Sequence, residues 1–454
     1  MFRKQIEYLR EWKTRADRKP LIVRGARQVG KTWLVRQLGT EFENYIEINF
    51  DGTPEKSSLF KFRDVNEILL LLEADFNTKV IPYNTLIFLD EIQSCPEAVA
   101  LLRYFYEKRP DIHVIAAGSL LEFLFSDHNF SMPVGRIEFL YMNPLTFEEF
   151  LIANGENGLF QFLQNYNLEK EIPDSIHQKL LQYLKHYSII GGMPQAVSYW
   201  VNEHDLTMVS RCHSSILTTY QADFSKYGKN ANSELIKKCL RTIPSLIGTK
   251  IKYVNIDKNV KSADVSKALE HLFYAGLIIL VYHTDGNGLP LGATISKKIF
   301  KAVFLDVGLF STQLSLRLSQ LCISDDLMLI HTGALAEQLI GQTIFTTGEP
   351  WWEPELFYWH REERNSSAEI DYLTQISNNV VPIEVKAGKT GTLRSLHIFV
   401  HEKKSKYAIR FNTDLPSVHK VNTAVTGFEN TAFTLLSLPL YLCEQRERLL
   451  NCAQ

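Results

Sequence analysis

Residues 25–33, GARQVGKTW, have the spacing of a phosphate-binding loop, in which Gly25 and four further residues precede Gly30-Lys31-Thr32. Glycines at both ends allow the backbone to curl around phosphate oxygens and to turn its N–H groups inward. Lys31 would reach the β- and γ-phosphates of a nucleotide, and the Thr32 hydroxyl would be a ligand of Mg²⁺. The alternative is a tight turn that holds no ligand. The residues expected to contact the nucleotide are Gly25, Ala26, Arg27, Gln28, Val29, Gly30, Lys31, Thr32 and Trp33.

Two carboxylates follow an apolar run in LIFLDE, residues 86–91. At the end of a buried strand, Asp90 would hold the Mg²⁺ shell and Glu91 would act as the general base that activates water. Taken alone, such a pair is more often a helix cap exposed to solvent. The phosphate-binding pattern upstream favours the catalytic interpretation.

Ser119 and Arg136 are further candidates for the same chemistry. Ser119 ends the apolar run AAGS (116–119), where its hydroxyl could sense the γ-phosphate or position the attacking water. A serine helix cap is an equal alternative. Arg136 could supply positive charge to the transition state, in cis or from a neighbouring subunit. A surface arginine that precedes a strand explains it equally well.

A second group of charged residues lies near the end of the chain, in EIDYL (369–373) and PIEVKAG (382–388). Glu384 and Lys386 are two residues apart on an expected strand, so both side chains point to one face, and Asp371 can lie beside them across a hairpin. Two carboxylates and a lysine can hold Mg²⁺ and activate water on a phosphodiester. Alternating charged and apolar residues also occur on any half-exposed strand.

The elements that must position these residues fall into four segments. In residues 1–150, apolar runs such as 21–25 and 85–93 alternate with helical patterns such as 31–39, which predicts a parallel α/β sheet built from βαβ units. The four predicted domains are a P-loop ATPase domain (1–150), a helical lid (151–245), a winged-helix-like segment (246–325) and a C-terminal α/β domain (326–454).

The order of short motifs along the chain resembles a family of bacterial and archaeal AAA+-like P-loop ATPases with a trailing domain of uncharacterised function. The motifs are GARQVGKT, LIFLDEIQ, AAGS, GRIEFL, PLTFEEF, GGMPQAV and TTYQADFSKY, and together they cover nearly the whole chain. The resemblance implies an ASCE-type nucleotide fold that uses ATP and Mg²⁺, a helical lid and a winged helix. It also implies a C-terminal domain similar to restriction endonucleases.

Asp371, Glu384 and Lys386 resemble the signature of PD-(D/E)xK nucleases. That fold often carries another carboxylate on a preceding helix, and Glu337 in GALAEQLI fits this position. Related domains can keep the fold for binding alone, so cleavage and binding without cleavage both stay open.

Composition restricts the class of protein. The net charge of −2 argues against a wholly basic nucleic-acid binder but allows a local basic face. The six cysteines form no CxxC pair, which is typical of reduced thiols and not of a disulfide framework. The chain has no apolar run long enough to cross a membrane, so we expect a cytoplasmic protein without a membrane partner.

Two functions are consistent with these residues. The first is a Mg²⁺-dependent ATPase whose nucleotide cycle controls a C-terminal domain directed at nucleic acid, with DNA as the expected partner, a nuclease activity left open, and a homo-oligomer allowed. The alternative is a nucleotide-gated adaptor that binds a protein partner through a catalytically silent C-terminal domain. The intact Glu91 argues against the adaptor, because a pure switch can dispense with the base.

Overall fold

The computed structural model describes residues 1–62, 64–119, 121–125, 134–224, 232–314, 328–363, 366–386, 393–422 and 431–453. The chain divides into two compact units. The first unit contains Met1–Pro144 together with two short later segments, Tyr274–Gly276 and Gly348–Glu353. The second unit contains Leu145–Phe273, Leu277–Thr347 and Pro354–Gln454.

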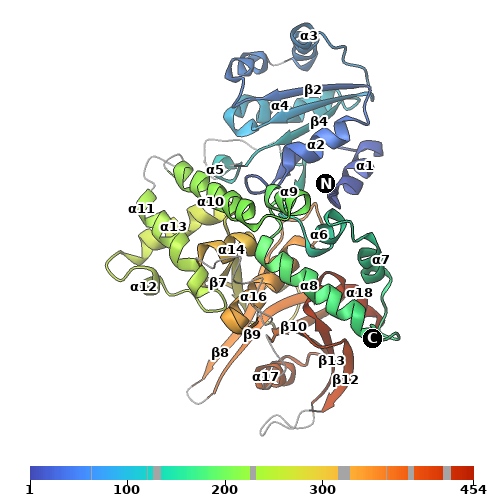
Figure 1. The fold of residues 1–454 in the computed structure, drawn as a ribbon. Coiled ribbons are helices and arrows are strands. Elements are labelled where there is room, and N and C mark those ends of the chain that lie inside the picture. The colour runs from blue at the N-terminus through green and yellow to red at the C-terminus, as the bar shows by residue number, and fades with distance from the viewer. Residues whose placement is uncertain are drawn as a thin grey trace. The chain divides into compact units, whose positions relative to one another are not determined.

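A five-stranded parallel sheet forms the centre of the first unit (Figure 1). Its strand order is β2-β3-β4-β1-β5, which confirms the parallel α/β fold predicted for this region. The strands are β1 (Leu21–Arg24), β2 (Asn44–Asn49), β3 (Thr85–Asp90), β4 (His113–Ala117) and β5 (Glu138–Tyr141). Every residue of β1, β3 and β4 is buried, as expected when helices cover both faces of a parallel sheet.

The helices of the first unit pack apolar side chains against this sheet. Ile46 and Leu89 on the strands, for example, share one core with Leu102 and Phe105 on α4. The helices are α1 (Gln5–Thr14), α2 (Lys31–Gly39), α3 (Val65–Phe76), α4 (Pro96–Lys108) and α5 (Leu121–Phe125). Because the strands are parallel, the loops that follow β1, β3 and β4 meet at one edge of the sheet.

The second unit begins with helices. They are α6 (Phe147–Ala153), α7 (Asn157–Asn165), α8 (Asp174–Ile190), α9 (Pro194–Glu203), α10 (Leu206–Asp223), α11 (Ser233–Thr242), α12 (Tyr253–Ile256) and α13 (Ser262–Tyr274). Later helices are α14 (Val307–Gln313), α16 (Met328–Thr346), α17 (Arg394–Lys403) and α18 (Arg446–Cys452). The end of the TTYQADFSKY motif, residues 225–227, lies outside the described residues.

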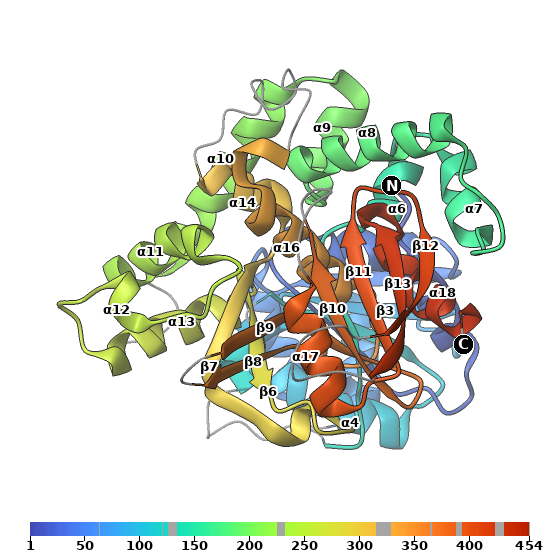
Figure 2. The ribbon, with the colours of Figure 1, turned by 90° about the horizontal axis from the view of Figure 1, so that it is seen from below.

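An eight-stranded mixed sheet completes the second unit, in the order β12-β13-β11-β10-β9-β8-β6-β7 (Figure 2). The strands are β6 (Ile278–Thr284), β7 (Ile295–Phe304), β8 (Leu356–Glu363), β9 (Ser366–Ile376), β10 (Asn379–Val385), β11 (Tyr407–Asn412), β12 (Ser417–Asn422) and β13 (Ala432–Pro439). Because β6 pairs with β8, one sheet spans both the segment predicted as winged-helix-like and the predicted C-terminal domain. The β9–β10 hairpin turns at Ser377, whose φ is 52°.

The GGMPQAV motif has a packing role that residue types alone do not reveal. A Cβ atom at Gly191 would lie 2.1 Å from Oδ1 of Asp306, and one at Gly192 would lie 2.1 Å from the carbonyl oxygen of Leu145. The buried Asp306 carboxylate accepts hydrogen bonds from the backbone N–H groups of Gly192 (2.6 Å), Gly308 (3.0 Å) and Leu309 (3.2 Å). The two glycines therefore let this carboxylate join the end of α8 to the start of α14.

Candidate functional site

The loop between β1 and α2 has backbone angles that only certain residues adopt. Gly25 has φ 143°, Gln28 has φ 64°, and Gly30 has φ 96° immediately before α2. A Cβ atom at Gly25 would lie 2.0 Å from the carbonyl oxygen of Met142. Gly25 is thus required both for its conformation and for close contact with the chain after β5. The loop and the N-terminus of α2 thus have the arrangement that the phosphate-binding pattern predicts, in which backbone N–H groups can face an anion.

Lys31 is buried, and its ammonium group donates to loop carbonyl oxygens. Nζ lies 2.9 Å from the oxygen of Gly25 and 2.8 Å from that of Ala26. Burial lowers the pKa of Lys31 to about 8, because desolvation penalises the charged form more than Glu91 and Asp90 favour it. Neutral carbonyl groups thus hold this lysine in place, and they do not neutralise its charge.

Thr32 and Asp90 meet at the edge of the sheet. The Thr32 hydroxyl donates to Oδ2 of Asp90 at 2.9 Å, and the Asn49 side-chain amide donates to the same oxygen at 3.4 Å. Burial raises the pKa of Asp90, and the hydrogen bond from Thr32 opposes that rise. Hydroxyl and carboxylate oxygens are the ligands that Mg²⁺ prefers, so this pair fits the ion. Asn49, at the end of β2, was not identified from the sequence.

Glu91 follows β3 in a left-handed conformation, with φ 50°. Its Oε2 atom accepts a hydrogen bond from the Gln93 amide at 2.6 Å and one from the Ser119 hydroxyl at 3.4 Å. Arg27 of the phosphate loop in turn donates to the Ser119 hydroxyl at 3.2 Å. The structure therefore brings Arg27, Glu91 and Ser119 together, and it adds Gln93 as a residue that orients Glu91.

Arg136 does not join this group in the same chain. It precedes β5, whose first residue Glu138 pairs with Leu21 at the start of β1, whereas the phosphate loop follows the other end of β1. Its guanidinium forms an ion pair with Glu107 of α4, with Nε and Oε1 3.0 Å apart. A role of Arg136 in cis is therefore wrong on geometric grounds, and a role from a neighbouring subunit stays a prediction.

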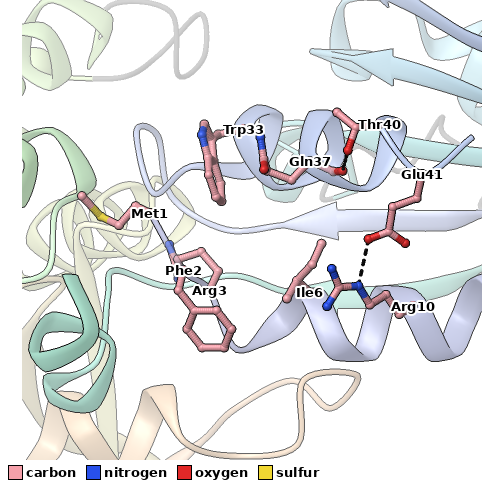
Figure 3. Close-up of a pocket in the computed structure, with 9 residues that line it drawn as sticks. All are labelled: Met1, Phe2, Arg3, Ile6, Arg10, Trp33, Gln37, Thr40 and Glu41. Atoms are coloured by element: carbon pink, nitrogen blue, oxygen red, sulfur yellow. Dashed lines mark hydrogen bonds and ion pairs between the residues drawn. The ribbon is translucent and has the colours of Figure 1, made fainter. Parts of the chain in front are cut away.

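Trp33, the last predicted loop residue, lies at the start of α2 and is 38% exposed. It lines a groove of about 320 Å³ between α1 and α2, together with Met1, Phe2 and Arg3 (Figure 3). Arg3 donates to the carbonyl oxygen of Val29 at 2.7 Å and so ties the start of the chain to the phosphate loop. The complete lining is Met1, Phe2, Arg3, Ile6, Arg10, Trp33, Gln37, Thr40 and Glu41.

The segment Tyr274–Gly276 also contacts the phosphate loop within the first unit. A Cβ atom at Gly276, which has φ 70°, would lie 3.0 Å from the Cβ of Ala26. The Tyr274 ring packs edge-on against Phe123 of α5, with 5.6 Å between ring centroids. This short turn joins α13 to β6, so it is covalently continuous with two elements of the second unit.

The charged residues near the end of the chain also come together, in the second unit. Asp371 of β9 accepts a hydrogen bond from the backbone N–H of Val385 at 2.7 Å, which places it beside β10. Glu384 is buried and forms an ion pair with Lys386, as expected for residues that share a face. The other oxygen of Glu384, Oε2, is buried and has no hydrogen-bond partner among the described residues.

Glu337 of α16 joins the same cluster, and it faces a lysine that was not identified from the sequence. Nζ of Lys301, on β7, lies 3.7 Å from Oε2 of Glu337 and forms a second ion pair with Glu369 of β9. Lys301 also lies 5.1 Å from the centroid of the Tyr358 ring. We call Lys301, Glu337, Glu369, Asp371, Glu384 and Lys386 the acidic cluster.

The pKa values in the acidic cluster follow from burial and mutual repulsion. Burial and the nearby Asp371 raise the pKa of Glu337 to about 8 and that of Glu384 to about 7. Burial also raises the pKa of Asp371. Burial alone would lower the pKa of Lys301, but the surrounding carboxylates outweigh it and raise that pKa. Among the described residues, no three His, Cys, Asp or Glu side chains are arranged to hold a metal ion.

Three segments of the chain match models of known families. Residues 17–151 match a family model described as an AAA domain. Residues 181–320 and 332–431 match two models described as domains of unknown function, DUF8612 and DUF4143. No curated protein matches the sequence. Among the described residues, no helix is long and apolar enough to span a membrane.

Several solved structures are similar to this chain at low identity. The Walker-type ATPase PABY2304 of Pyrococcus abyssi is 15% identical, with 68% of this chain and 95% of that chain covered and a TM-score of 0.42. The ORC2 protein of Aeropyrum pernix is 15% identical, with coverages of 71% and 94% and a TM-score of 0.36. The ORC1 protein of Aeropyrum pernix, solved in complex with DNA, is 13% identical, with coverages of 69% and 93% and a TM-score of 0.29.

These TM-scores are too low to carry an argument about this chain. Residues 17–151 are thus similar to an AAA domain, and within them the loop, Thr32 and Asp90 have a geometry that suits a nucleotide phosphate and Mg²⁺.

Proposed function

We propose that the chain hydrolyses ATP with Mg²⁺ at the edge of the five-stranded sheet, and that this cycle controls the second unit. The observation that carries the proposal is the hydrogen bond from Thr32 to Asp90, next to a Glu91 that Gln93 and Ser119 hold in place. A metal ligand pair and a fixed carboxylate base are the two parts that a hydrolytic P-loop site needs.

Each residue has a defined task in this proposal. The loop N–H groups and Lys31 bind the phosphates, and Lys31 must leave the carbonyl oxygens of Gly25 and Ala26 to do so. Thr32 and Asp90 would hold Mg²⁺, which neutralises charge on the β- and γ-phosphates when bound. Glu91 takes the proton of the attacking water, and Arg27 and Ser119, which contact each other beside Glu91, would bind the γ-phosphate.

We assign the groove beside Trp33 to the nucleobase of the nucleotide. It adjoins the start of α2, and Trp33 and Phe2 offer it aromatic surface (Figure 3). Base stacking on an aromatic side chain is worth about 1–3 kcal/mol. We therefore include Trp33 among the nucleotide contacts.

ATP hydrolysis by the full chain tests this proposal. We expect phosphate release that requires Mg²⁺ and is lost in Lys31→Ala, because the variant removes the cation that binds the phosphates. Lys61→Ala is a matched control, since Lys61 is an exposed lysine of the same unit. Hydrolysis by Lys31→Ala at the rate of the Lys61→Ala control would contradict the assignment of the site.

A second function, directed at nucleic acid, is favoured by exposed basic residues in the second unit. They lie on α11 and α13 and in the segment between these helices, in the region predicted as winged-helix-like. The exposed basic residues are Lys238, Arg241, Lys252, Lys258, Lys261 and Lys267. Such a group can bind phosphates, and the affinity would then fall steeply with salt.

Asp371, Glu384 and Lys386 are the proposed nuclease residues of this second function, and the adaptor with a silent C-terminal domain is its alternative. Measuring ATP hydrolysis with single-stranded DNA, duplex DNA and RNA separates the two. Stimulation by one of them, with cleavage that Asp371→Ala abolishes and Lys31→Ala retains, is expected for a nuclease whose active site is separate from the ATPase site. Tight nucleotide binding without stimulation, gel shift or cleavage is expected for the adaptor.

A further inference from the structure

The groove between α1 and α2 gathers apolar side chains that are exposed to solvent (Figure 3). Met1, Phe2 and Trp33 expose 39%, 38% and 38% of their surface. Large apolar side chains that surround one hollow mark a binding surface, whereas apolar residues exposed singly do not. Trp33 directly follows Thr32, so a nucleotide whose phosphates lie on the loop can place its base in this groove.

The polar side chains of the groove differ in whether they already have a partner. Arg10 and Glu41 form an ion pair, with Nε and Oε1 2.8 Å apart. The Thr40 hydroxyl donates to the backbone carbonyl oxygen of Gln37 at 2.8 Å, and Arg3 is tied to the phosphate loop. The side-chain amide of Gln37 makes no hydrogen bond with the other lining residues, all of which the structure describes (Figure 3). It is therefore the polar group that the groove offers to a ligand.

Gln37 lies one helical turn after Trp33 on α2, so the two side chains share a face of the helix. The amide end of Gln37 is turned toward the Trp33 ring (Figure 3). A base that stacks on this ring presents its edge to the amide. Stacking alone does not distinguish bases, because every base has a π-face, so discrimination must come from the edge.

The Gln37 amide carries an acceptor oxygen and an N–H₂ donor side by side. Adenine offers the matching pair on one edge, an exocyclic amino donor next to a ring-nitrogen acceptor, so two hydrogen bonds can form at once. Hypoxanthine and guanine carry an exocyclic oxygen in place of that amino group, and they offer two acceptors there. The amide oxygen would then face another acceptor, and one of the two hydrogen bonds would be lost.

We propose that Gln37 reads the edge of the nucleobase while Trp33 stacks on its face, and that this pair selects adenine nucleotides over 6-oxopurine nucleotides. The phosphate loop and Lys31 contact groups that every nucleoside triphosphate shares, so they cannot supply this selectivity. The inference rests on the proposed ATPase function, and it adds a specificity residue outside the phosphate loop.

The test is the affinity of the full-length chain for the Mg²⁺ complexes of ADP, IDP and inorganic pyrophosphate, measured by calorimetry. ADP and IDP differ in the exocyclic group of the base, and pyrophosphate has no base. We expect the unsubstituted chain to bind ADP about tenfold more tightly than IDP. Gln37→Ala should bind ADP and IDP equally and should keep its affinity for pyrophosphate. Gln178→Ala is the matched control, since Gln178 is an exposed glutamine of α8, and it should keep the preference.

Two further variants separate stacking from edge recognition. Gln37→Met keeps the length of the side chain and removes the amide, so it should lose the preference as Gln37→Ala does. Trp33→Ala should weaken ADP and IDP by a similar factor, about tenfold, and leave pyrophosphate unchanged. The pyrophosphate affinity shows that the phosphate loop of each variant is intact.

An ADP preference that Gln37→Ala and Gln37→Met both retain would overturn the inference. Equal affinities of the unsubstituted chain for ADP and IDP would overturn it as well. If Mg²⁺-dependent ATP hydrolysis is then still lost in Lys31→Ala, the proposed function stands without this inference. Binding of none of the three probes would contradict both.

Discussion

Lys31 in the first unit and Lys301 in the second are both buried, but the direct partners of Lys31 are neutral whereas those of Lys301 are negatively charged. Lys31 donates to two neutral carbonyl oxygens, and burial lowers its pKa to about 8. Lys301 faces the carboxylates of Glu337 and Glu369, which raise its pKa despite burial. The first lysine has no ion-pair partner in direct contact, while the second is paired with carboxylates.

This difference indicates which ligand each site can take. A buried ammonium whose direct partners are neutral carbonyl groups gains strongly when an anion binds, so the phosphate loop is suited to a nucleotide. A buried ammonium held by carboxylates has nothing to gain from an anion, and it excludes a cation. The following predictions test this contrast, starting with the largest expected effect.

Gly25→Ala should weaken ATP binding by about 100-fold, because its Cβ atom would displace either the phosphate loop or the Met142 carbonyl group. Gly135→Ala is the control, since Gly135 also has a positive φ but has no atom within 4 Å of the place that the new methyl group would take. Titration of a fluorescent ATP analogue measures both. Equal affinities in the two variants would show that the loop does not hold the nucleotide in this conformation.

Asp306→Asn should lower the free energy of unfolding of the second unit by about 1–3 kcal/mol. The carboxylate accepts from the N–H groups of Gly192, Gly308 and Leu309, and an asparagine amide would place its own N–H₂ group against one of these donors. Denaturant unfolding measures the loss. An unchanged free energy of unfolding would mean that the hydrogen bonds to the Asp306 carboxylate do not stabilise the second unit.

ATP affinity should fall about tenfold per pH unit as the pH rises above 8. The free protein's Lys31 has a pKa of about 8, and bound phosphate raises that pKa by adding negative charge. The binding form is the ammonium, so affinity is complete below pH 8 and is lost between the free and the bound pKa values. Calorimetry in buffers of different ionisation enthalpy should show proton uptake at about pH 8.5. An ATP affinity that stays constant over about one pH unit on either side of the Lys31 pKa of the free protein would contradict the lowered pKa.

Gly276→Ala should weaken ATP binding by a smaller factor, about threefold to tenfold, because its Cβ would only press on Ala26 of the phosphate loop. Gly155→Ala carries the same backbone penalty at φ 79° without a neighbour, so it should leave ATP affinity unchanged. If the two variants bind ATP equally, the turn between α13 and β6 does not sense the nucleotide site.

The sequence predicts the phosphate site well because its parts are local. Gly25 to Thr32 are contiguous, and Asp90, Glu91 and Ser119 each end an apolar strand at the same edge of a parallel sheet. The sequence pattern does not show at which edge of the sheet the start of β5 lies, so it could not exclude Arg136 from this site in the same chain; its role from a neighbouring subunit stays a prediction.

The acidic cluster could be predicted only in part. The proximity of Asp371, Glu384 and Lys386 could be predicted because side chains two residues apart on a strand of a hairpin share a face. Lys301 could not be predicted, because it comes from β7, and no local sequence pattern shows that β7 joins this sheet through β6. Gln93 and Asn49 were missed for the same reason, since their roles depend on which carboxylate lies opposite.

The most direct test of the central claim is the rate of Mg²⁺-dependent ATP hydrolysis by the full-length Glu91→Gln chain, with ATP binding measured on the same sample. In the proposed mechanism Glu91, held by Gln93 and Ser119, transfers a proton and does not bind the nucleotide. The rate should therefore fall by about 10²–10⁴-fold while ATP affinity stays unchanged. Hydrolysis at the unsubstituted rate would contradict the assignment of Glu91 as the base and of this site as the one that hydrolyses ATP.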